Sequence, residues 1–179
     1  MKQQKKYFKN LEDFLNSSLS SHTDIEIRLP QSQIGELGIS NLSSALVKCT
    51  NLSNLTLDLY QNQIGDQGVQ ILGSALANCS QLKILSLDLQ HNQIHELGTQ
   101  GFCTSLANCS NLSALVLRLS FNQIGSEGAQ SLGTALIKLR NISTLKLNIL
   151  YNQVSQGQRW NLIKKIFNLK KLVAKSIYV

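Results

Sequence analysis

The sequence predicts an α/β solenoid, with a parallel β-sheet on the concave face of a horseshoe and α-helices on its convex face. The first observation is a fixed period of 30 residues, which runs through Asn62, Asn92, Asn122 and Asn152. The second is that each period contains a segment with strand spacing followed by a segment with helical spacing. A period of this size over several copies indicates a solenoid, because each unit buries its apolar face only against its neighbours.

Each unit begins with a predicted strand. Leu85, Leu87 and Leu89 alternate with the polar residues Ser86 and Asp88. This alternation is typical of a strand with one buried face. Paired in parallel, strands of successive units would place their leucines in a common core and leave the alternate side chains on the open face of the sheet.

A helix is predicted in the second half of each unit. Leu72, Ala75 and Leu76 recur at helical intervals and define one apolar face. At the start of this segment Gly65 precedes Asp66, which predicts a tight turn followed by an N-cap residue.

The asparagine that follows each strand is predicted to be buried. Its amide can satisfy backbone groups in the turn that leaves the strand, whereas an aliphatic side chain could not. In the first unit Ser32 takes the place of the asparagine, 30 residues before Asn62.

The pattern LxxLxLxLxxNxI followed by GxxxLxxAL resembles the leucine-rich repeat family, in its long, helix-containing form similar to ribonuclease inhibitor. The usual core of that family is LxxLxLxxNxL, and here two residues are inserted, as between Leu82 and Asn92. The resemblance covers about residues 22–179. It implies a horseshoe that usually recognises another protein, without identifying that protein.

One domain in three parts is predicted, with a helical cap over residues 1–21, repeats over 22–155 and a C-terminal capping repeat over 156–179. The apolar residues of the first part have the spacing of one amphipathic helix: Phe8, Leu11, Phe14, Leu15 and Leu19. In the last part Lys165 takes the slot that Ala135 holds one unit earlier. A lysine in this slot predicts a helix face that no neighbouring helix covers.

Composition and motifs argue against catalysis, a metal or a cofactor. Cys49, Cys79 and Cys109 share one slot of the repeat, and Leu139 takes the same slot, so we expect buried free thiols, Cys103 included. No CxxC pair, GxGxxG loop or Walker pattern occurs.

No apolar run approaches the roughly 20 residues of a membrane span. Without a secretory signal, the chain is expected to be intracellular, most simply cytoplasmic, and monomeric.

Partner binding is predicted on the concave face, where side chains vary from unit to unit while the core positions hardly change. The candidate residues are Asp58, Tyr60, Asp88, His91, Arg118, Phe121 and Tyr151. Aromatic residues and arginine are the types that anchor protein interfaces. The two aspartates are expected on neighbouring strands, where like charges favour a cation or a basic partner group. The alternative interpretation is a solvated face without a partner.

The basic residues gather at the C-terminal end. The formal net charge is +7. Six of the 17 basic residues lie after residue 149, where no acidic residue occurs, which leaves 11 basic against 10 acidic residues before it. A second candidate patch, for RNA, anionic lipid or an acidic protein surface, comprises Arg159, Lys164, Lys165, Lys170 and Lys171. We favour a solubility and capping role for these lysines.

The function predicted from these observations is a non-catalytic scaffold that binds a partner protein on the concave face of the horseshoe. One alternative is a regulator of an enzyme, such as a GTPase-activating or inhibitor-like repeat protein. The other is an architectural subunit of a large assembly that is anchored through the basic end.

Overall fold

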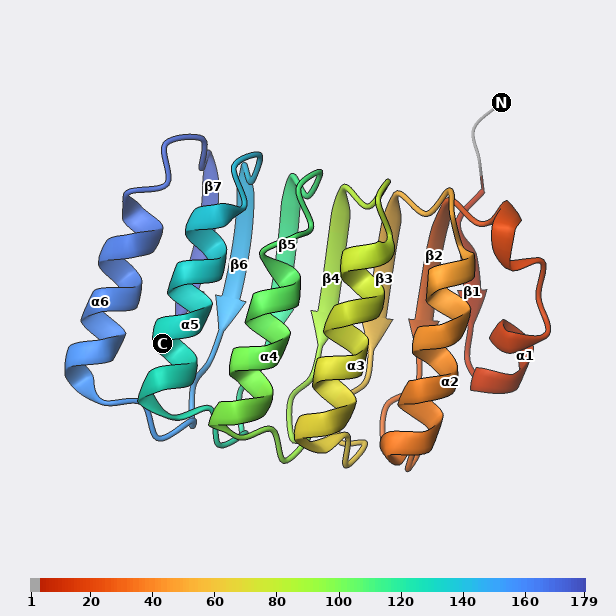
Figure 1. Ribbon diagram of the computed structural model, residues 1–179, viewed down its shortest axis with the longest axis horizontal. Helices are drawn as coiled ribbons and strands as arrows, with labels where there is room; N and C mark the ends of the chain where they lie inside the picture. The colour runs from red at the N-terminus through yellow and green to blue at the C-terminus, as the bar shows by residue number, and fades with distance from the viewer. Residues whose placement is uncertain (1–3) are drawn as a thin grey trace.

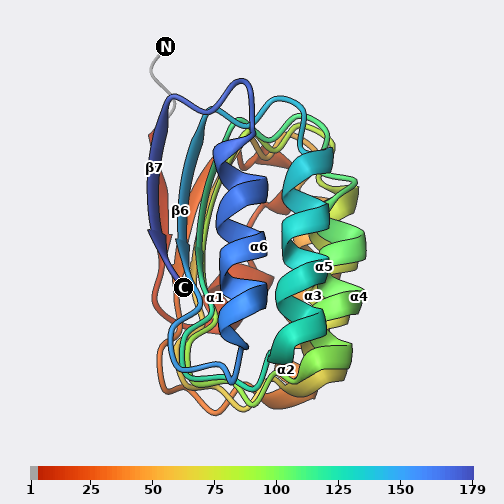
Figure 2. The same cartoon turned by 90° about the vertical axis from the view of Figure 1, so that its left-hand side faces the viewer.

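The computed structural model describes residues 4–179 as one parallel sheet with helices packed along one of its sides (Figure 1 and Figure 2). The strands follow one another in sequence order across the sheet. They are β1 (Lys6–Phe8), β2 (Asp24–Arg28), β3 (Asn54–Asp58), β4 (Ile84–Asp88), β5 (Ala114–Arg118), β6 (Thr144–Asn148) and β7 (Ala174–Tyr178). The predicted α/β solenoid is therefore confirmed.

One helix connects each pair of consecutive strands from β2 onward and returns the chain to the end of the sheet at which the next strand begins (Figure 1). These helices are α2 (Gly35–Lys48), α3 (Gly65–Asn78), α4 (Glu96–Leu106), α5 (Gly125–Lys138) and α6 (Gln156–Phe167). Strands and helices form two layers, and the core lies between them (Figure 2). Among residues 4–179, no helix lies on the other side of the sheet (Figure 2).

The register between strands repeats the sequence period. Leu55 lies opposite Leu85, and Leu85 lies opposite Leu115. The side chains of Leu85, Leu87 and Leu89 are fully buried, which confirms the strand alternation. Because each residue of β2 to β6 pairs with the residue 30 positions along, each core position of these strands stacks on its own equivalent in the next repeat.

The asparagines Asn62, Asn92, Asn122 and Asn152, here called the asparagine ladder, are buried with at most 6% exposure. Asn92 Oδ1 accepts hydrogen bonds from the backbone N–H of Asn62 at 2.9 Å and of Ile64 at 3.4 Å. Its Nδ2 donates to the backbone oxygens of Leu59 at 2.8 Å and Gln90 at 3.0 Å. Three of these four groups belong to the preceding repeat, so each amide joins two repeats as well as closing its own turn.

The predicted N-cap role of Asp66 is wrong. Helix α3 begins at Gly65, whose φ is +65°, and no side chain caps it. Asp66 instead accepts a hydrogen bond at Oδ1 from the backbone N–H of His95, at 2.6 Å. The Asp66 carboxylate therefore binds a backbone N–H of the next repeat and does not cap the helix of its own repeat.

The predicted single helix at the N-terminal end is also wrong. Phe8 ends strand β1, which pairs with β2, and only Leu11–Leu15 form a helix, α1. The side chain of Asn10 accepts from the backbone N–H of Asp13 and caps this helix. A 3₁₀ turn, η1, follows at Leu19–Ser21. The apolar side chains still face the first repeat: Phe14 is fully buried, and Phe8, Leu11, Leu15 and Leu19 pack against the core.

His22 is buried beneath this N-terminal segment, with 2% exposure. Its Nε2 lies 2.8 Å from Ser17 Oγ, and the Ser17 hydroxyl itself donates to the Phe14 carbonyl. The neutral ring therefore donates from Nε2, and within residues 4–179 its Nδ1 has no hydrogen-bond partner. Burial, followed by the nearby charge of Lys6, lowers the pKa of His22 below its ordinary value.

We expect the stability of the protein to fall as the pH drops from about 7.5 to about 5.5, because unfolded chains then bind a proton at His22 more readily than folded ones. In the unfolded state this histidine titrates near its ordinary pKa of 6.5. Because the pKa of His22 is lower in the folded state, the histidine contributes stability above pH 6.5, and this contribution is lost progressively as the pH falls below 6.5. Thermal unfolding at several pH values measures the effect. His22→Gln should remove most of this pH dependence, whereas the exposed-site change His95→Gln should retain it.

The cysteines are free and buried, as the repeat slot predicts. Burial raises the pKa of Cys49 and Cys103 to about 12, and that of Cys79 and Cys109 to about 11. Thiols with such pKa values stay protonated at neutral pH, so these side chains act as small core residues rather than nucleophiles.

Candidate functional site

The uncovered side of the sheet, here called the strand face, presents rows of side chains that cross the strands, and two of these rows carry most of its charged residues. The first row contains Glu26, Thr56, Ser86, Val116, Lys146 and Ser176. The second contains Arg28, Asp58, Asp88, Arg118, Asn148 and Tyr178. Glu26, Asp58 and Asp88 lie on β2 to β4, where Arg28 is also present, and the basic side chains Arg118 and Lys146 lie on β5 and β6.

Asp58 and Asp88 are neighbours in register, as predicted. Each carboxylate accepts a hydrogen bond at 3.1 Å from a backbone N–H two residues on, at Tyr60 and Gln90 respectively. Arg118 Nη1 lies 3.9 Å from Asp88 Oδ2, so a cation of the chain itself stands beside the pair. The inference that these aspartates favour a basic partner group therefore loses its main support.

Glu26 belongs to the same face, but it is only 5% exposed and takes no part in an open surface. Lys5 Nζ lies 2.6 Å from Glu26 Oε2, and Arg28 Nε donates to Oε1. These two cations hold the pKa of Glu26 below its ordinary value, with the larger effect from Lys5, although burial alone would raise it. The sequence pattern missed this cluster because it gave no sign that the chain before residue 10 joins the sheet.

Three predicted site residues form one stack, here called the aromatic ladder: His91, Phe121 and Tyr151. The His91 and Phe121 rings are 4.3 Å apart at 10°, and the Phe121 and Tyr151 rings are 4.3 Å apart at 17°. Tyr60 meets His91 edge to face at 5.3 Å. Four of the seven candidate residues are therefore in contact as one cluster, next to the strand face but in the turns that leave the strands.

The backbone explains why the rings stack. Every residue at this turn position has a positive φ, from 53° at Gln31 and 54° at Gln61 to 59° at Tyr151. Side chains other than glycine rarely adopt this conformation, and residues held in it cluster at functional sites. Equivalent turns repeat at the spacing of neighbouring strands, about 4.8 Å, which suits offset stacking of rings.

The aromatic ladder is open to solvent along its edge. Phe121 is 45% exposed and Tyr151 is 66% exposed, although both are large apolar side chains. A shallow hollow of about 320 Å³ lies beside His91 and Phe121, and its lining includes the amide side chains of Gln63, Gln93 and Gln123. Rigid rings next to amide donors and acceptors form a surface with both apolar and polar anchoring groups.

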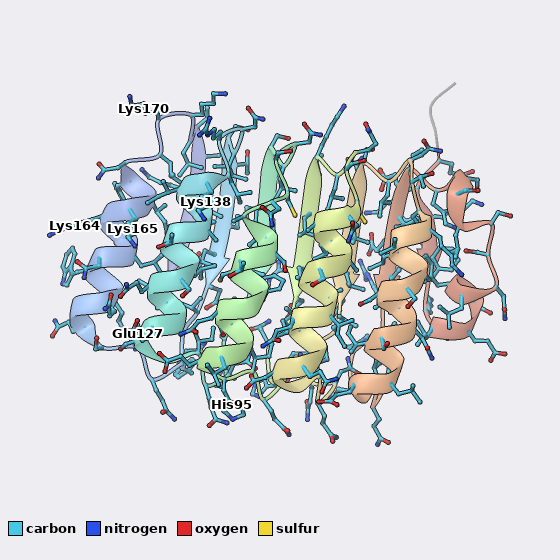
Figure 3. All side chains as sticks on the ribbon, viewed as in Figure 1. His95, Glu127, Lys138, Lys164, Lys165 and Lys170 are labelled. Atoms are coloured by element: carbon cyan, nitrogen blue, oxygen red, sulfur yellow. The ribbon has the colours of Figure 1, made fainter. Side chains whose placement is uncertain are left out.

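The second candidate patch is less open than its charge suggests. Arg159 Nε donates to the Val154 carbonyl at 3.0 Å. Lys171 Nζ donates to Asn141 Oδ1 at 3.1 Å. Lys164 and Lys170 are exposed (Figure 3).

The prediction that Lys165 marks an uncovered helix face is wrong. Its Nζ donates to Thr134 Oγ1 on α5 at 3.2 Å. Its aliphatic stem lies over Gly133, where a Cβ atom would come within 2.8 Å of Lys165 Cδ. The lysine thus packs against the preceding helix through its methylene groups while its charge reaches solvent.

Within residues 4–179 no group of three or more histidine, cysteine or acidic side chains is arranged to hold a metal ion. In the same part of the chain, no helix has both the length and the apolar character needed to cross a membrane.

Comparisons with known proteins agree with the repeat architecture. A family model described as "Leucine Rich repeat" matches residues 51–73 and 110–133. The solved structure of "Leiomodin-1 Actin-Binding Site 2 (ABS2)" is similar over 90% of this chain and 86% of that chain, with a TM-score of 0.59 and 16% identity. An internalin (inlF) from Listeria monocytogenes str. 4b F2365 aligns over 96% of this chain and 58% of that chain, at 19% identity and a TM-score of only 0.34. No curated protein sequence matches the chain.

Proposed function

Since the chain is a leucine-rich-repeat protein of the long, helix-containing type, we propose that it binds a partner protein through the aromatic ladder and the adjoining strand face, without catalysis of its own. The observation that carries this proposal is the exposed stack of His91, Phe121 and Tyr151. Similarity at 16% identity extends to the fold alone, so the actin binding for which the leiomodin-1 segment is named supplies no partner for this chain.

The aromatic ladder suits binding because its rings are already fixed. Immobilising a side chain on association costs roughly 0.5–1.5 kcal/mol, and stacking of the rings meets this cost within the free protein. Tyrosine and other aromatic side chains also supply large contact areas and dominate the energetics of interfaces. Arg118, with its side chain 45% exposed, adds a charged anchor on the adjoining strand face.

The triple variant H91Q/F121Q/Y151Q tests the proposal. Gln31 and Gln61 occupy the same turn position at the same positive φ, so glutamine fits the backbone at all three sites. We expect the folded variant to lose at least about tenfold in affinity for the partner, since it gives up several aromatic contacts. Affinity capture from cell lysate, quantified by mass spectrometry for parent and variant side by side, measures the loss.

The matched control is W160Q/F167Q, which removes exposed aromatic rings from helix α6. Trp160 is 58% exposed and Phe167 is 61% exposed, values comparable with those of the ladder. Partners that depend on the ladder should remain bound to this control. Equal loss from both variants would point to nonspecific apolar capture, and retention of all partners by the glutamine triple variant would reject the proposal.

A further inference from the structure

A groove of about 420 Å³ lies between the turn that follows α5 and the turn that follows α6. Both turns are at the top of the molecule in Figure 1, where the strands begin. The turns that carry the aromatic ladder lie at the opposite ends of the strands. The floor of the groove is apolar. Leu139 and Ile142 are 2% exposed, Leu169 is partly buried against the core, and Ile137 is 50% exposed.

The rim of the groove is cationic, formed by Arg140, Lys165, Lys170 and Lys171. The sequence contains no acidic residue after Glu127, and residues 128–179 carry nine basic ones. Glu127 lies at the far end of α5 from Lys138 (Figure 3). None of the ion pairs found among residues 4–179 involves a cation of this groove. The positive charge is therefore balanced by no side chain of the described chain.

The repeats themselves show that these charges are not needed for folding. Earlier turns carry neutral residues at the position of Arg140 and Lys170: Thr50, Ser80 and Ser110. Both cations also lie beyond the last residues of α5 and α6, so they are not part of the helical turns where a lysine offsets the helix dipole.

The apolar part of the groove departs from the repeats of α3 and α4. The position of Ile137 is held there by alanine, at Ala77 and Ala107, and in the repeat of α2 by Val47, which is 44% exposed. At this corner of the molecule a half-exposed isoleucine lies beside four cations.

We propose that this groove binds an acidic peptide segment of a second protein. An apolar side chain of the segment packs on Ile137 and Leu169, and its carboxylates face Arg140, Lys170 and Lys171. Two of the rim lysines are already held in place, because Lys165 donates to Thr134 and Lys171 donates to Asn141. No aromatic ring lines the groove, which argues against single-stranded nucleic acid, since bases stack on such rings. The proposal does not rest on the function assigned to the ladder.

Binding of a labelled peptide, rich in glutamate with two central leucines, tests this proposal by fluorescence anisotropy at physiological salt. The variant R140S/K170S/K171N gives each position a residue type found at the equivalent turn position of an earlier repeat. We expect this variant to bind the peptide at least about tenfold more weakly than the parent, because it lacks three cations that face the carboxylates of the peptide. The control K9S/K48N/K83S removes three exposed lysines elsewhere and should bind within about twofold of the parent.

The apolar contact is tested separately with Ile137→Ala. This variant should weaken binding of the leucine-containing peptide about threefold to tenfold, as expected for lost apolar burial. It should leave unchanged the weaker binding of a peptide with serine in place of leucine. Equal affinities of the parent and R140S/K170S/K171N, or no saturable binding by the parent, would overturn the proposal. It would also be overturned if a single-stranded RNA or an anionic vesicle bound the groove more tightly than the peptide.

Discussion

Replacing Asn92 by alanine should destabilise the protein by about 3–5 kcal/mol, the largest effect we expect from a single substitution. The amide binds the N–H groups of Asn62 and Ile64 and the carbonyls of Leu59 and Gln90. Alanine would leave three of these backbone groups unpaired in a buried turn, since the Gln90 carbonyl still accepts from the Gln61 N–H, and each unpaired group costs roughly 1–3 kcal/mol. Local relaxation and water entry recover part of the total. Denaturant unfolding, followed by circular dichroism, measures the loss.

Asn161→Ala is the matched control, because Asn161 is an exposed asparagine on helix α6. It should change the free energy of unfolding by no more than about 0.5 kcal/mol. A loss below about 1 kcal/mol for Asn92→Ala would show that the asparagine ladder is not the main tie between neighbouring turns.

Gly98→Ala should destabilise the protein by about 1–3 kcal/mol, because helix α4 passes too close to helix α3 to admit a side chain. A Cβ atom at Gly98 would stand 2.7 Å from Asp66 Cα, which is backbone and has little freedom to move. Asp66 also accepts the hydrogen bond from His95, so a displacement would disturb the contact between the two repeats. Thermal unfolding should show a clear fall in Tm.

Gly157→Ala is the control in α6, one position before the residue equivalent to Gly98. A Cβ atom there would meet nothing within 4 Å, and the φ of Gly157 is not positive. Alanine favours helix over glycine by roughly 0.5–1 kcal/mol, so this variant should be slightly more stable than the parent. If Gly98→Ala behaved like Gly157→Ala, the close packing of α3 and α4 described above would be contradicted.

Most of the fold could be predicted from the sequence because a repeat gives the same information several times. Leu85, Leu87 and Leu89 define the buried face of a strand, and the fixed period sets the register of the strand pairs from β2 to β7. The cysteine slot is identified as core because Leu139 also fills it. Errors that one repeat would allow are corrected by comparison with the others.

The N-terminal segment lacked that comparison, and there the prediction failed. Its apolar residues suit a helix by spacing, but Asn10 caps the chain so that α1 begins only at Leu11, and pairing with β2 draws Phe8 into a strand. Such pairing depends on a sheet edge that the sequence of the segment does not contain.

The candidate site was predictable by residue type but not by contact. His91, Phe121 and Tyr151 share one position of the period, which placed them in one row of the sequence. Their stacking depends on a positive φ that only coordinates reveal. Likewise, the groove between the turns after α5 and α6 joins Ile137 to Lys170, residues of different repeats that no single-repeat pattern connects.

Site-specific photocrosslinking tests the central claim, binding through the aromatic ladder, most directly. A benzoylphenylalanine placed at Tyr151, which is 66% exposed, is compared with the same group at Trp160, which is 58% exposed on helix α6. We expect a covalent adduct between position 151 and the captured partner protein, and none from position 160. An adduct formed from position 160, with none from position 151, would place the partner away from the ladder and contradict binding through it.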